Sequence, residues 1–469
     1  MGNHFLSGLA RAGSLACIAL LAACGGGNSS DVYSVGGTAT GLASGSAVVL
    51  QLNGAATITV SANGRFTFGS PLQGNVDYSV TVLTEPADQV CNLDSASGKF
   101  PGADVTGVTL SCYATFKVLY SFSGGADGRN GADPTAGLVQ GADGAFYGTT
   151  QALAMTGQNA TVFKVTSAGD MTVLYNFPAP TQGYYTVSSL VQGTDGNFYG
   201  TTSALHPGTG DSGLGGIYGT VFSVTPSGAF TLLHIFGASQ FDGLDPEAAL
   251  IQATDGSFYG TTAAGGTAAF GTVFRITPSG AETVLYSFPS GLSGPIPLGT
   301  LLQGVDGNFY CIDPTASGLY RIGTDGTATV FATFKELTTP VGTLLQDGSG
   351  NIFGAAQAAT GEIFSVTPSG AISVVYSFAE ELGSISGLRL ASDASFYGTT
   401  SYIPSIEFHG QTFADVAGTV FSVTPAGAGT TLYAFGNSTI SPLVRANDGH
   451  YYGVSEFDGT YGLGAVIEF

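Results

Sequence analysis

Charged side chains are scarce in this sequence of 469 residues, and basic side chains are the scarcest. Only 9% of the residues are charged, and 11 lysines and arginines stand against 32 aspartates and glutamates, which gives a formal net charge of −21 at pH 7. A protein this acidic repels the phosphate groups of DNA and RNA. We therefore expect no nucleic acid partner.

Tryptophan is absent, and long helices are not expected either. The chain has 73 glycines, about twice the usual share, and each glycine inside a helix costs roughly 1 kcal/mol relative to alanine. So high a glycine content favours a fold with many tight turns. Hydrophobic residues make up 43% of the chain, with 21 tyrosines and 31 phenylalanines, and this fraction excludes general disorder.

The first 24 residues have the pattern of an export signal. Arg11 precedes an apolar run at 15–23 that is too short to cross a bilayer as a helix. The run leads into Leu-Ala-Ala-Cys at 21–24, which resembles the lipobox of bacterial lipoproteins, where the cysteine becomes the lipidated first residue. The alternative is an ordinary secretory signal in which Cys24 occurs by chance.

The residues after Cys24 agree with a lipid anchor. A glycine-rich tether follows at 25–31, and Gly25 stands where an aspartate would signal retention at the inner membrane in that family. The resemblance implies a lipoprotein of the cell envelope, held at the outer membrane and facing either the periplasm or the cell surface. No later stretch reaches 18 consecutive apolar residues, so the lipid on Cys24 is the membrane attachment that we predict.

The remaining cysteines agree with an oxidising compartment. Cys17 leaves with the signal, and Cys91 and Cys112 are predicted to form a disulfide, which would close a loop of about twenty residues worth roughly 3 kcal/mol. The alternative is two free thiols. Cys311 occupies a small-residue position in a predicted strand, and we expect it to be a buried thiol.

Residues 32–113 are predicted to form a small β-sandwich domain. Short alternating runs such as 56–60 and 78–82 are typical of strands with one buried face, and Asn53-Gly54 is a signal for a tight hairpin. The segment has no histidine and no acidic cluster with the spacing of metal ligands. Its expected role is that of a stalk or adaptor.

From residue 114 onward the sequence repeats itself. Three phrases occur seven times each, some copies decayed: Leu-x-Gln-x-x-Asp-Gly-x-Phe-Tyr-Gly-Thr-Thr, Gly-Thr-Val-Phe-x-Val-Thr-Pro-Ser-Gly and Thr-x-Leu-Tyr-Ser-Phe. The period is about 43 to 60 residues, which lies in the range of propeller blades. Each unit holds four strand-sized runs, joined by Asp-Gly and Pro-Ser-Gly turns. We therefore predict an all-β chain whose residues 114–469 form a seven-bladed β-propeller.

The two ends of the repeat region predict a closed ring. The region opens with a fourth strand alone at 116–122 and stops after a third strand at 464–469. Neither end completes a blade, but together they make one. An open solenoid would instead require polar caps at both ends.

These phrases resemble the bacterial GloVer tandem-repeat family, most clearly at 258–262 and 271–280, with weaker copies across about three quarters of the chain. The family is defined by its repeats and not by an activity, so the resemblance implies no catalytic residues. The match weakens locally, for example at Ser349-Gly350, which replaces Asp-Gly.

The repeated Asp-Gly carboxylates suggest either calcium binding or turn formation. They are Asp143, Asp195, Asp255, Asp306, Asp393 and Asp448. No second carboxylate stands one or two residues away, as a calcium loop requires, and a hairpin aspartate commonly bonds to its own backbone. We therefore predict a structural role in the turns.

The longer connections between strands are the predicted binding face. In a propeller the second-to-third and fourth-to-first connections emerge on one face, and here they are long, as at 123–137, 203–218, 237–248 and 401–417. Our candidate binding residues in them are Asp127, Asp133, Tyr184, Tyr185, His206, Asp211, Phe241, Asp242, Asp245, His409 and Asp415, and the same connections carry Arg129, Glu247 and Glu407.

Each of these candidates has a plainer interpretation. The loops from Asp127-Gly128 to Asp133-Pro134 and from Asp242-Gly243 to Asp245-Pro246 look like the same loop in two blades, which fits a structural turn as well as a ligand site. Pairs such as His206 with Asp211 could also be solvated loop residues. No catalytic residues and no metal ligands are assigned.

Two classes of function fit this sequence. The first is a non-catalytic binding module that presents its long-loop face to a glycan, a peptide or an envelope protein, as a monomer. The alternative is a propeller enzyme, a lyase or hydrolase with a metal or acidic centre at the ring mouth. The lack of tryptophan weighs against sialidase and quinoprotein propellers. No cofactor is predicted, although calcium or another divalent metal stays open.

Overall fold

The computed structural model describes residues 32–469 apart from several short segments. The segments left out are 44, 74–75, 87–88, 100–102, 115, 125–130, 153–158, 178–185, 204–217, 240, 290–298, 314–317, 335–338, 358–360, 379–383, 392, 403–404, 409–410, 415–416, 436–440 and 457–459. The regular elements of the described part are all β-strands, and it contains no helix long and apolar enough to cross a membrane. The predicted signal, Cys24 and the tether lie outside the described residues.

Residues 32–114 form an N-terminal unit of two four-stranded sheets and one short ribbon. The first sheet runs β5 (Gly64–Thr67), β2 (Val35–Thr40), β10 (Val105–Ala114) and β8 (Gln89–Asp94), and the second runs β4 (Ala56–Val60), β3 (Val48–Leu52), β7 (Tyr78–Thr84) and β9 (Ser97–Gly98). The ribbon pairs β1 (Val32–Tyr33) with β6 (Leu72–Gln73). β10 runs parallel to β2 and antiparallel to β8.

The alternating pattern of the sequence produces the core of this unit. Along β3, Val48, Leu50 and Leu52 are buried, while the residues between them are half-buried, because successive side chains of a strand point to opposite faces. Leu50 and Leu110, which lie in different sheets, belong to one core cluster. The two sheets therefore share a hydrophobic core.

The predicted disulfide is present. Cys91 on β8 and Cys112 on β10 are directly opposite each other in the antiparallel register and are joined as a disulfide. Cys311 is a buried thiol on a strand of the repeat region, as expected.

The repeat region consists of consecutive four-stranded antiparallel sheets. In chain order the first sheet is β12 (Val139–Gln140), β13 (Phe146–Thr150), β14 (Thr161–Val165) and β15 (Met171–Asn176). The second is β17 (Val191–Gln192), β18 (Phe198–Ser203), β19 (Thr220–Val224) and β20 (Phe230–Ile235), and β16 (Thr186–Val187) also pairs with β18. The third is β22 (Ile251–Gln252), β23 (Phe258–Thr262), β25 (Thr272–Ile276) and β26 (Glu282–Ser287), and the fourth is β27 (Leu302–Gln303), β28 (Phe309–Asp313), β29 (Gly318–Ile322) and β30 (Ala328–Thr333). Each is named below by its fourth strand, as the β20 sheet.

Three further sheets complete this region. They are β31 (Thr339–Gln346), β32 (Ile352–Gln357), β33 (Gly361–Val366), β34 (Ile372–Ser377); β35 (Ser384–Leu390), β36 (Phe396–Tyr402), β39 (Ala417–Val423), β40 (Gly429–Phe435); and the closing sheet, β41 (Val444–Arg445), β42 (Tyr451–Ser455), β43 (Ala465–Glu468), β11 (Lys117–Ser121). Two of the long connections contribute to short ribbons. β21 (Gly243–Leu244), in the connection 237–248, pairs with β24 (Ala264–Gly265), which lies between β23 and β25, and within the connection 401–417 β37 (Ser405–Phe408) pairs with β38 (Gln411–Ala414).

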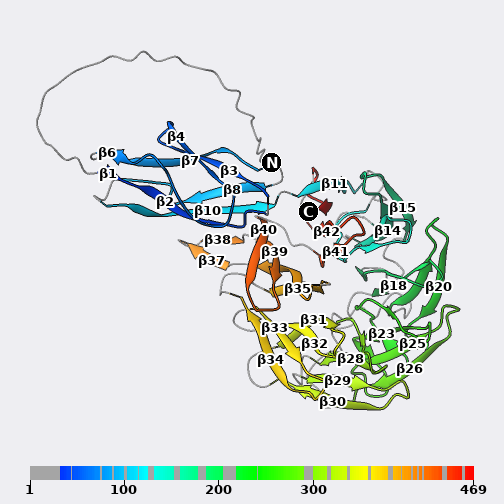
Figure 1. Ribbon diagram of the computed structural model, residues 1–469. Coiled ribbons are helices and arrows are strands. Elements are labelled where there is room, and N and C mark those ends of the chain that lie inside the picture. The colour runs from blue at the N-terminus through cyan, green and yellow to red at the C-terminus, as the bar shows by residue number, and fades with distance from the viewer. Residues whose placement is uncertain are drawn as a thin grey trace, which may run out of the picture.

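The sheets follow one another around a ring, and the two ends of the repeat region meet (Figure 1). As predicted, β11 pairs antiparallel with β43, with Lys117 opposite Glu468 and Ser121 opposite Ala465. The side chains of Lys117 and Glu468 also form an ion pair of 3.2 Å. The arrangement is β-propeller-like, and the N-terminal unit lies outside the ring beside β40 (Figure 1).

The Asp-Gly turns have the structural role predicted for them. In the β26 sheet, Asp255 Oδ1 accepts a hydrogen bond from the backbone N–H of Ser257 at 2.9 Å, and Tyr259 donates its hydroxyl to Asp255 Oδ2 at 3.0 Å. Gly256 has a φ of 78°, which glycine adopts at little cost. The same tyrosine-to-aspartate bond occurs at Asp143, Asp195, Asp306 and Asp448.

A repeated glutamine joins most of the sheets to the sheet before them. Gln252 Oε1 accepts a hydrogen bond from the backbone N–H of Thr194 in the β20 sheet at 2.8 Å. The glutamines of the same phrase make equivalent bonds, Gln192 with Ala142, Gln303 with Thr254 and Gln346 with Val305. Two copies lack the glutamine, because Leu390 and Arg445 stand at its position.

Aromatic rings of the Phe-Tyr-Gly phrase pack from sheet to sheet. Tyr147 stacks on Phe198 with ring centroids 3.8 Å apart, and Tyr199 stacks on Phe258 at 3.9 Å. Across the closure, Tyr452 stacks on Phe146 at 4.0 Å. These rings are almost completely buried, and such pairs add about 0.5–1.5 kcal/mol each to the free energy of their burial.

Candidate functional site

A cavity lies where the first strands of the sheets converge. Its volume is about 380 Å³. Its lining includes one residue at or near the first strand of each of six sheets. Gly137, Ser189, Ala249, Thr300 and Pro442 stand two positions before that strand, and Thr343 lies within β31. Because six sheets of one ring contribute to it, the cavity is on the ring axis, at the end reached by the fourth-to-first connections.

The lining is held by the Gly-Thr-Thr residues of the second strands. Thr201 is buried on β18 and donates its hydroxyl to the carbonyl of Ala248 at 3.1 Å, while its backbone N–H donates to Ser188 Oγ at 3.0 Å. Ser189 Oγ accepts the backbone N–H of Gly137 at 2.9 Å. Part of the hydroxyl lining is therefore committed to holding neighbouring sheets together.

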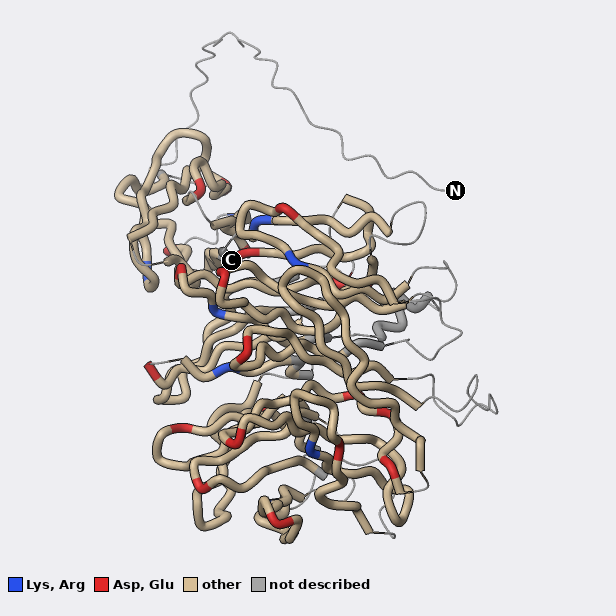
Figure 2. Tube along the Cα trace, turned by 90° about the vertical axis from the view of Figure 1, so that its right-hand side faces the viewer, with Lys and Arg blue, Asp and Glu red and all other residues tan. Residues whose placement is uncertain are grey.

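The lining of the cavity combines small polar and small apolar side chains, the apolar ones being four alanines and Pro442. Hydroxyls line it at Thr135, Thr300 and Thr343, and Glu247 is its one charged side chain among the described lining residues. Glu247 is exposed. Figure 2 shows the acidic positions of the described residues at many separate places along the trace.

Asp133 and Asp245 have equivalent structural roles. Both adopt a positive φ, of 55° and 63°. Each donates its backbone N–H to the preceding sheet, Asp133 to Leu463 at 3.0 Å and Asp245 to Tyr218 at 2.8 Å. The two Asp-Pro loops therefore join neighbouring sheets, and burial, followed by the charge of Glu456, raises the pKa of Asp133 to about 6.

The alignment of these loops differs by three residues from the one inferred from the sequence. Gly131 and Gly243 occupy equivalent places, because a Cβ atom on either would collide with a pair of threonine side chains from the second and third strands. In the sequence, Asn130 directly precedes Gly131 as Asp242 directly precedes Gly243. Asp242 is a carboxylate where the other copy has an amide.

Several candidate residues lie outside the described residues. They are Asp127, Tyr184, Tyr185, His206, Asp211, His409 and Asp415. Phe241 is described and is exposed, next to Asp242. Of the candidates, Asp242 is the one that the structure brings together with other groups able to bind a metal.

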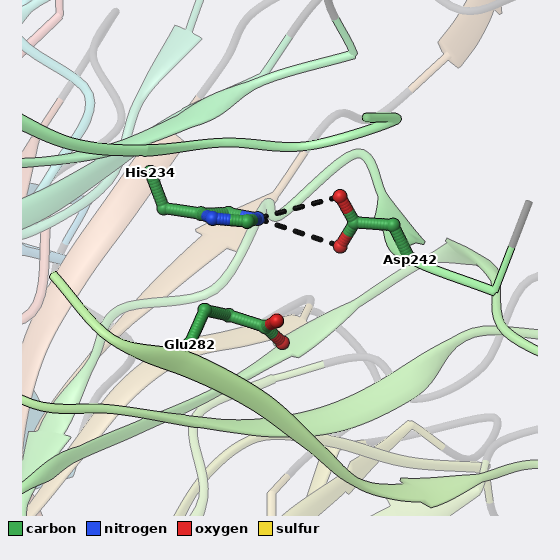
Figure 3. A group of neighbouring side chains, drawn as sticks. All are labelled: His234, Asp242 and Glu282. Atoms are coloured by element: carbon green, nitrogen blue, oxygen red, sulfur yellow. Dashed lines mark hydrogen bonds and ion pairs between the residues drawn. The ribbon is translucent and has the colours of Figure 1, made fainter. Parts of the chain in front are cut away.

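His234, Asp242 and Glu282 form a compact polar cluster (Figure 3). His234 is near the end of β20, Asp242 directly precedes β21, and Glu282 begins β26. One nitrogen or oxygen atom from each lies within 4.8 Å of the other two, and His234 Nε2 is 3.4 Å from Asp242 Oδ2. The cluster joins the fourth strands of two neighbouring sheets through the connection between them.

The two carboxylates of the cluster are in different environments. Asp242 is 6% exposed, and its Oδ2 accepts the backbone N–H groups of Gly237 at 3.0 Å and Ala238 at 3.2 Å. Glu282 Oε1 is buried and has no hydrogen-bond partner. Burial raises the pKa of Glu282 to about 7, with His234 acting to lower it and Asp242 to raise it.

Sequence reasoning missed His234 and Glu282, although the repeats contain the signal for both. The residues in register with His234 on the other fourth strands are Tyr120, Tyr175, Tyr286, Ala332, Tyr376 and Tyr433. Those in register with Glu282 on other fourth strands are Met171, Phe230, Ala328, Ile372 and Gly429. A histidine stands where five other copies have tyrosine and one has alanine, and a glutamate stands where the others have an apolar residue or glycine.

Solved structures with a similar fold include two lyases. The chain is similar to a streptogramin B lyase with 12% identity and a TM-score of 0.52, over 76% of this chain and 96% of that one. It is also similar to a catalytically inactive variant of virginiamycin B lyase from Staphylococcus aureus with quinupristin, with 14% identity and a TM-score of 0.51, over 76% and 99%. At such identity the likeness concerns the fold alone.

The sequence comparisons identify a family but no activity. No curated protein matches the chain. Residues 95–324 and 207–358 match the Gloeobacter/Verrucomicrobia repeat, and together these matches span 95–358, more than half of the 469 residues. The resemblance inferred from the repeated phrases is confirmed. The chain belongs to the Gloeobacter/Verrucomicrobia repeat family.

Proposed function

We propose that this protein is a lipid-anchored, non-catalytic binding module of the bacterial cell envelope. Its repeat region is a closed propeller of seven blades that takes a ligand at the axial cavity, and its N-terminal unit is a β-sandwich that serves as a stalk. The lipid on Cys24 holds the protein at the outer membrane.

The composition of the axial cavity is the observation that carries this proposal. The cavity gathers hydroxyls, small apolar side chains, backbone groups and the carboxylate of Glu247 from six sheets, and its described lining has no histidine, cysteine or lysine. Nucleophilic catalysis uses a nucleophile with an adjacent base, and general acid–base catalysis most often uses histidine. Hydroxyls and backbone groups are instead the usual means of orienting a polar ligand.

Seven blades and a sandwich are supported by the pairing of the strands. The β11–β43 pairing gives the last sheet its fourth strand, and the bond from Asn447 to Gln140 repeats across the closure the link that joins the other sheets. In the N-terminal unit, the core shared by two sheets and the Cys91–Cys112 disulfide support an independent domain.

The ligand that fits this cavity is a neutral or cationic polar molecule, such as a glycan or a peptide. An exposed carboxylate at the cavity and a net charge of −21 disfavour an anion. Hydroxyls of threonine and serine donate and accept hydrogen bonds, as sugar hydroxyls and peptide groups require. An envelope protein that presents such a group would bind in the same way.

The alternative function, a lyase or hydrolase with a metal or acidic centre at the ring mouth, has less support. The cluster with metal-binding chemistry is formed by fourth strands, which are at the far end of each sheet from the cavity. At the cavity itself, Glu247 is the one carboxylate among the described lining residues.

Binding to a panel of envelope glycans and cationic peptides tests the proposal. Thr300→Leu and Thr343→Leu place apolar bulk in the cavity, and each should weaken by at least tenfold the binding of any ligand that the wild-type protein retains. Val305→Ala is the matched control, because Val305 is exposed on a first-to-second turn, at the opposite end of the sheets.

Two results would contradict the proposal. One is a ligand that binds the Thr300→Leu and Thr343→Leu variants as well as it binds the wild-type protein. The other is a ligand that mass spectrometry finds cleaved or isomerised after incubation with the wild-type protein but unchanged after incubation with the variants, since this would establish catalysis at the cavity.

A further inference from the structure

We propose that His234, Asp242 and Glu282 form a binding site for a divalent transition-metal ion such as Zn²⁺, separate from the axial cavity. The ion would join the fourth strands of two neighbouring sheets through one imidazole nitrogen and two carboxylates (Figure 3). This site does not depend on the ligand proposed for the cavity.

The geometry of the cluster suits such an ion. Zinc is held at about 2.0–2.2 Å by nitrogen and carboxylate oxygen, so ligand atoms around a tetrahedral ion are about 3.3 Å apart. His234 Nε2 and Asp242 Oδ2 are 3.4 Å apart, and all three donor atoms are within 4.8 Å of one another. Small side-chain rotations would bring Glu282 to the same distance.

Asp242 is already held in position by the backbone. Its Oδ2 accepts the N–H groups of Gly237 and Ala238, which follow β20, so the loop orients the carboxylate toward His234. Hydrogen bonds to a ligating carboxylate fix its orientation and strengthen metal binding. The corresponding asparagine, Asn130, would supply no negative charge.

Glu282 gives an independent reason to expect a cation. Its Oε1 is buried and lacks a hydrogen-bond partner, and it is close to a second carboxylate, Asp242. An unpaired buried polar atom costs free energy, and two neighbouring carboxylates repel each other. A divalent cation would remove both costs, because it would neutralise the two charges and bond the unpaired oxygen.

At two other places in the ring, the equivalent contact between neighbouring sheets is an aromatic pair. Tyr175, in register with His234, stacks on Phe230, in register with Glu282, at 3.8 Å between ring centroids. Across the closure, Tyr433 packs edge-on against Phe116 at 5.2 Å. Between the β20 and β26 sheets, polar groups replace both members of the pair. One random substitution would not produce the matched set, which is the pattern expected of a binding site.

The type of donor selects the type of metal. Calcium takes six to eight oxygen ligands, and magnesium requires an octahedron of oxygens. An imidazole nitrogen with two carboxylates suits zinc and neighbouring transition metals. Three protein ligands leave a fourth position of the tetrahedron to water or to a group of a partner.

Zinc titration of the purified, chelator-treated protein tests the proposal. We expect one equivalent of Zn²⁺ to bind by isothermal titration calorimetry with micromolar or tighter affinity, and the melting temperature to rise with the zinc concentration. Ca²⁺ at the same concentration should leave the melting temperature unchanged.

The decisive variant is the double substitution His234→Tyr with Glu282→Phe, because it restores the aromatic pair of the preceding contact and should therefore fold. It should lose the zinc equivalent and the zinc-dependent rise in melting temperature. His450→Gln is the matched control, because His450 pairs with one carboxylate, Glu468, and should not be needed for binding.

Three outcomes would overturn the proposal. They are no zinc binding by the wild-type protein, the same zinc stoichiometry and affinity in the folded double variant, and loss of zinc binding in the His450→Gln variant alone. If the double variant does not fold, Glu282→Gln takes its place, and it should weaken zinc binding by at least tenfold while the protein without metal melts at the same temperature or above.

Discussion

Gln140 Oε1 accepts a hydrogen bond of 2.9 Å from the backbone N–H of Asn447, although 307 residues separate them in sequence. The same bond joins Gln252 to Thr194 within the ring. The structure thus uses one contact both between neighbouring sheets and across the junction of the chain ends. This equivalence makes the closure of the ring open to experiment.

Removal of residues 464–469 should lower the melting temperature of the whole repeat region. The deletion removes β43 and leaves β11 and β42 with unpaired edges. In a closed ring every sheet has two neighbours, so one lost strand weakens all of them. An open stack would lose one terminal repeat and leave the others unchanged. Thermal unfolding followed by circular dichroism distinguishes the two results.

Single substitutions provide a milder form of the same test. Gln140→Ala and Gln252→Ala each remove the bond to a backbone N–H of the neighbouring sheet, and each also removes a bond from the amide nitrogen to a carbonyl of its own turn, at Gly144 or Gly256. Each substitution should lower the free energy of unfolding by about 1–2 kcal/mol. If Gln140→Ala had no effect while Gln252→Ala destabilised the protein, the ring would not be closed in solution.

Loss of the Cys91–Cys112 disulfide should destabilise the N-terminal unit. The two cysteines are 21 residues apart in the sequence. By chain entropy, a disulfide that closes a loop of this length adds roughly 3 kcal/mol to the free energy of unfolding. The double substitution to alanine should therefore lower the urea midpoint of this unit. Mass spectrometry of unreduced peptides should find Cys91 joined to Cys112, and a bridge that contains Cys311 would contradict both the pairing and the burial of Cys311.

The substitution Asp133→Asn should make the protein more stable than the wild-type protein as the pH rises from about 4 to 6. The pKa of Asp133 is about 6 in the folded protein, above its ordinary value of 3.8. Between about pH 4 and 6 the folded state therefore binds more protons than the unfolded state, and the stability of the wild-type protein falls with rising pH. Asparagine tolerates the positive φ and does not titrate. Across this range the free energy of unfolding of the variant should rise by on the order of 1–2 kcal/mol relative to that of the wild-type protein.

The control for this pH experiment is Asp325→Asn. Hydrogen bonds from Thr327 lower the pKa of Asp325, so its carboxylate should stabilise the protein above its ordinary pKa and lose that effect in more acidic solution. Between pH 4 and 6, the free energy of unfolding of the Asp325→Asn variant should not rise relative to that of the wild-type protein. A parallel gain in both variants would mean that Asp133 is not the group responsible.

Cys24→Ser should release the protein from membranes. If the lipobox resemblance is correct, the wild-type protein partitions with the membrane fraction and incorporates labelled palmitate, and the variant appears in the soluble fraction. A variant that still sediments with membranes and still takes up palmitate would rule out Cys24 as the lipidated residue.

Repeated phrases made much of the fold predictable. Asp255, Gly256 and Tyr259 form one hairpin, and their spacing alone indicated the turn. The pairing of β11 with β43 followed from the phrase order, because an incomplete unit at each end has one simple completion. The ribbon β37–β38 was not predicted, since its sequence resembles none of the phrases.

Features that depend on neighbours along the chain could be predicted from the residues alone, and these are the four-stranded unit, its turns and its family. The approach of His234 to Glu282, 48 positions apart in the numbering, could not be predicted in this way, because that contact depends on how one sheet packs against the next. The axial cavity arises in the same way, from six sheets that each contribute a few small residues. Contacts within a repeat follow from local periodicity, whereas contacts between repeats follow from the angle and register at which the sheets meet.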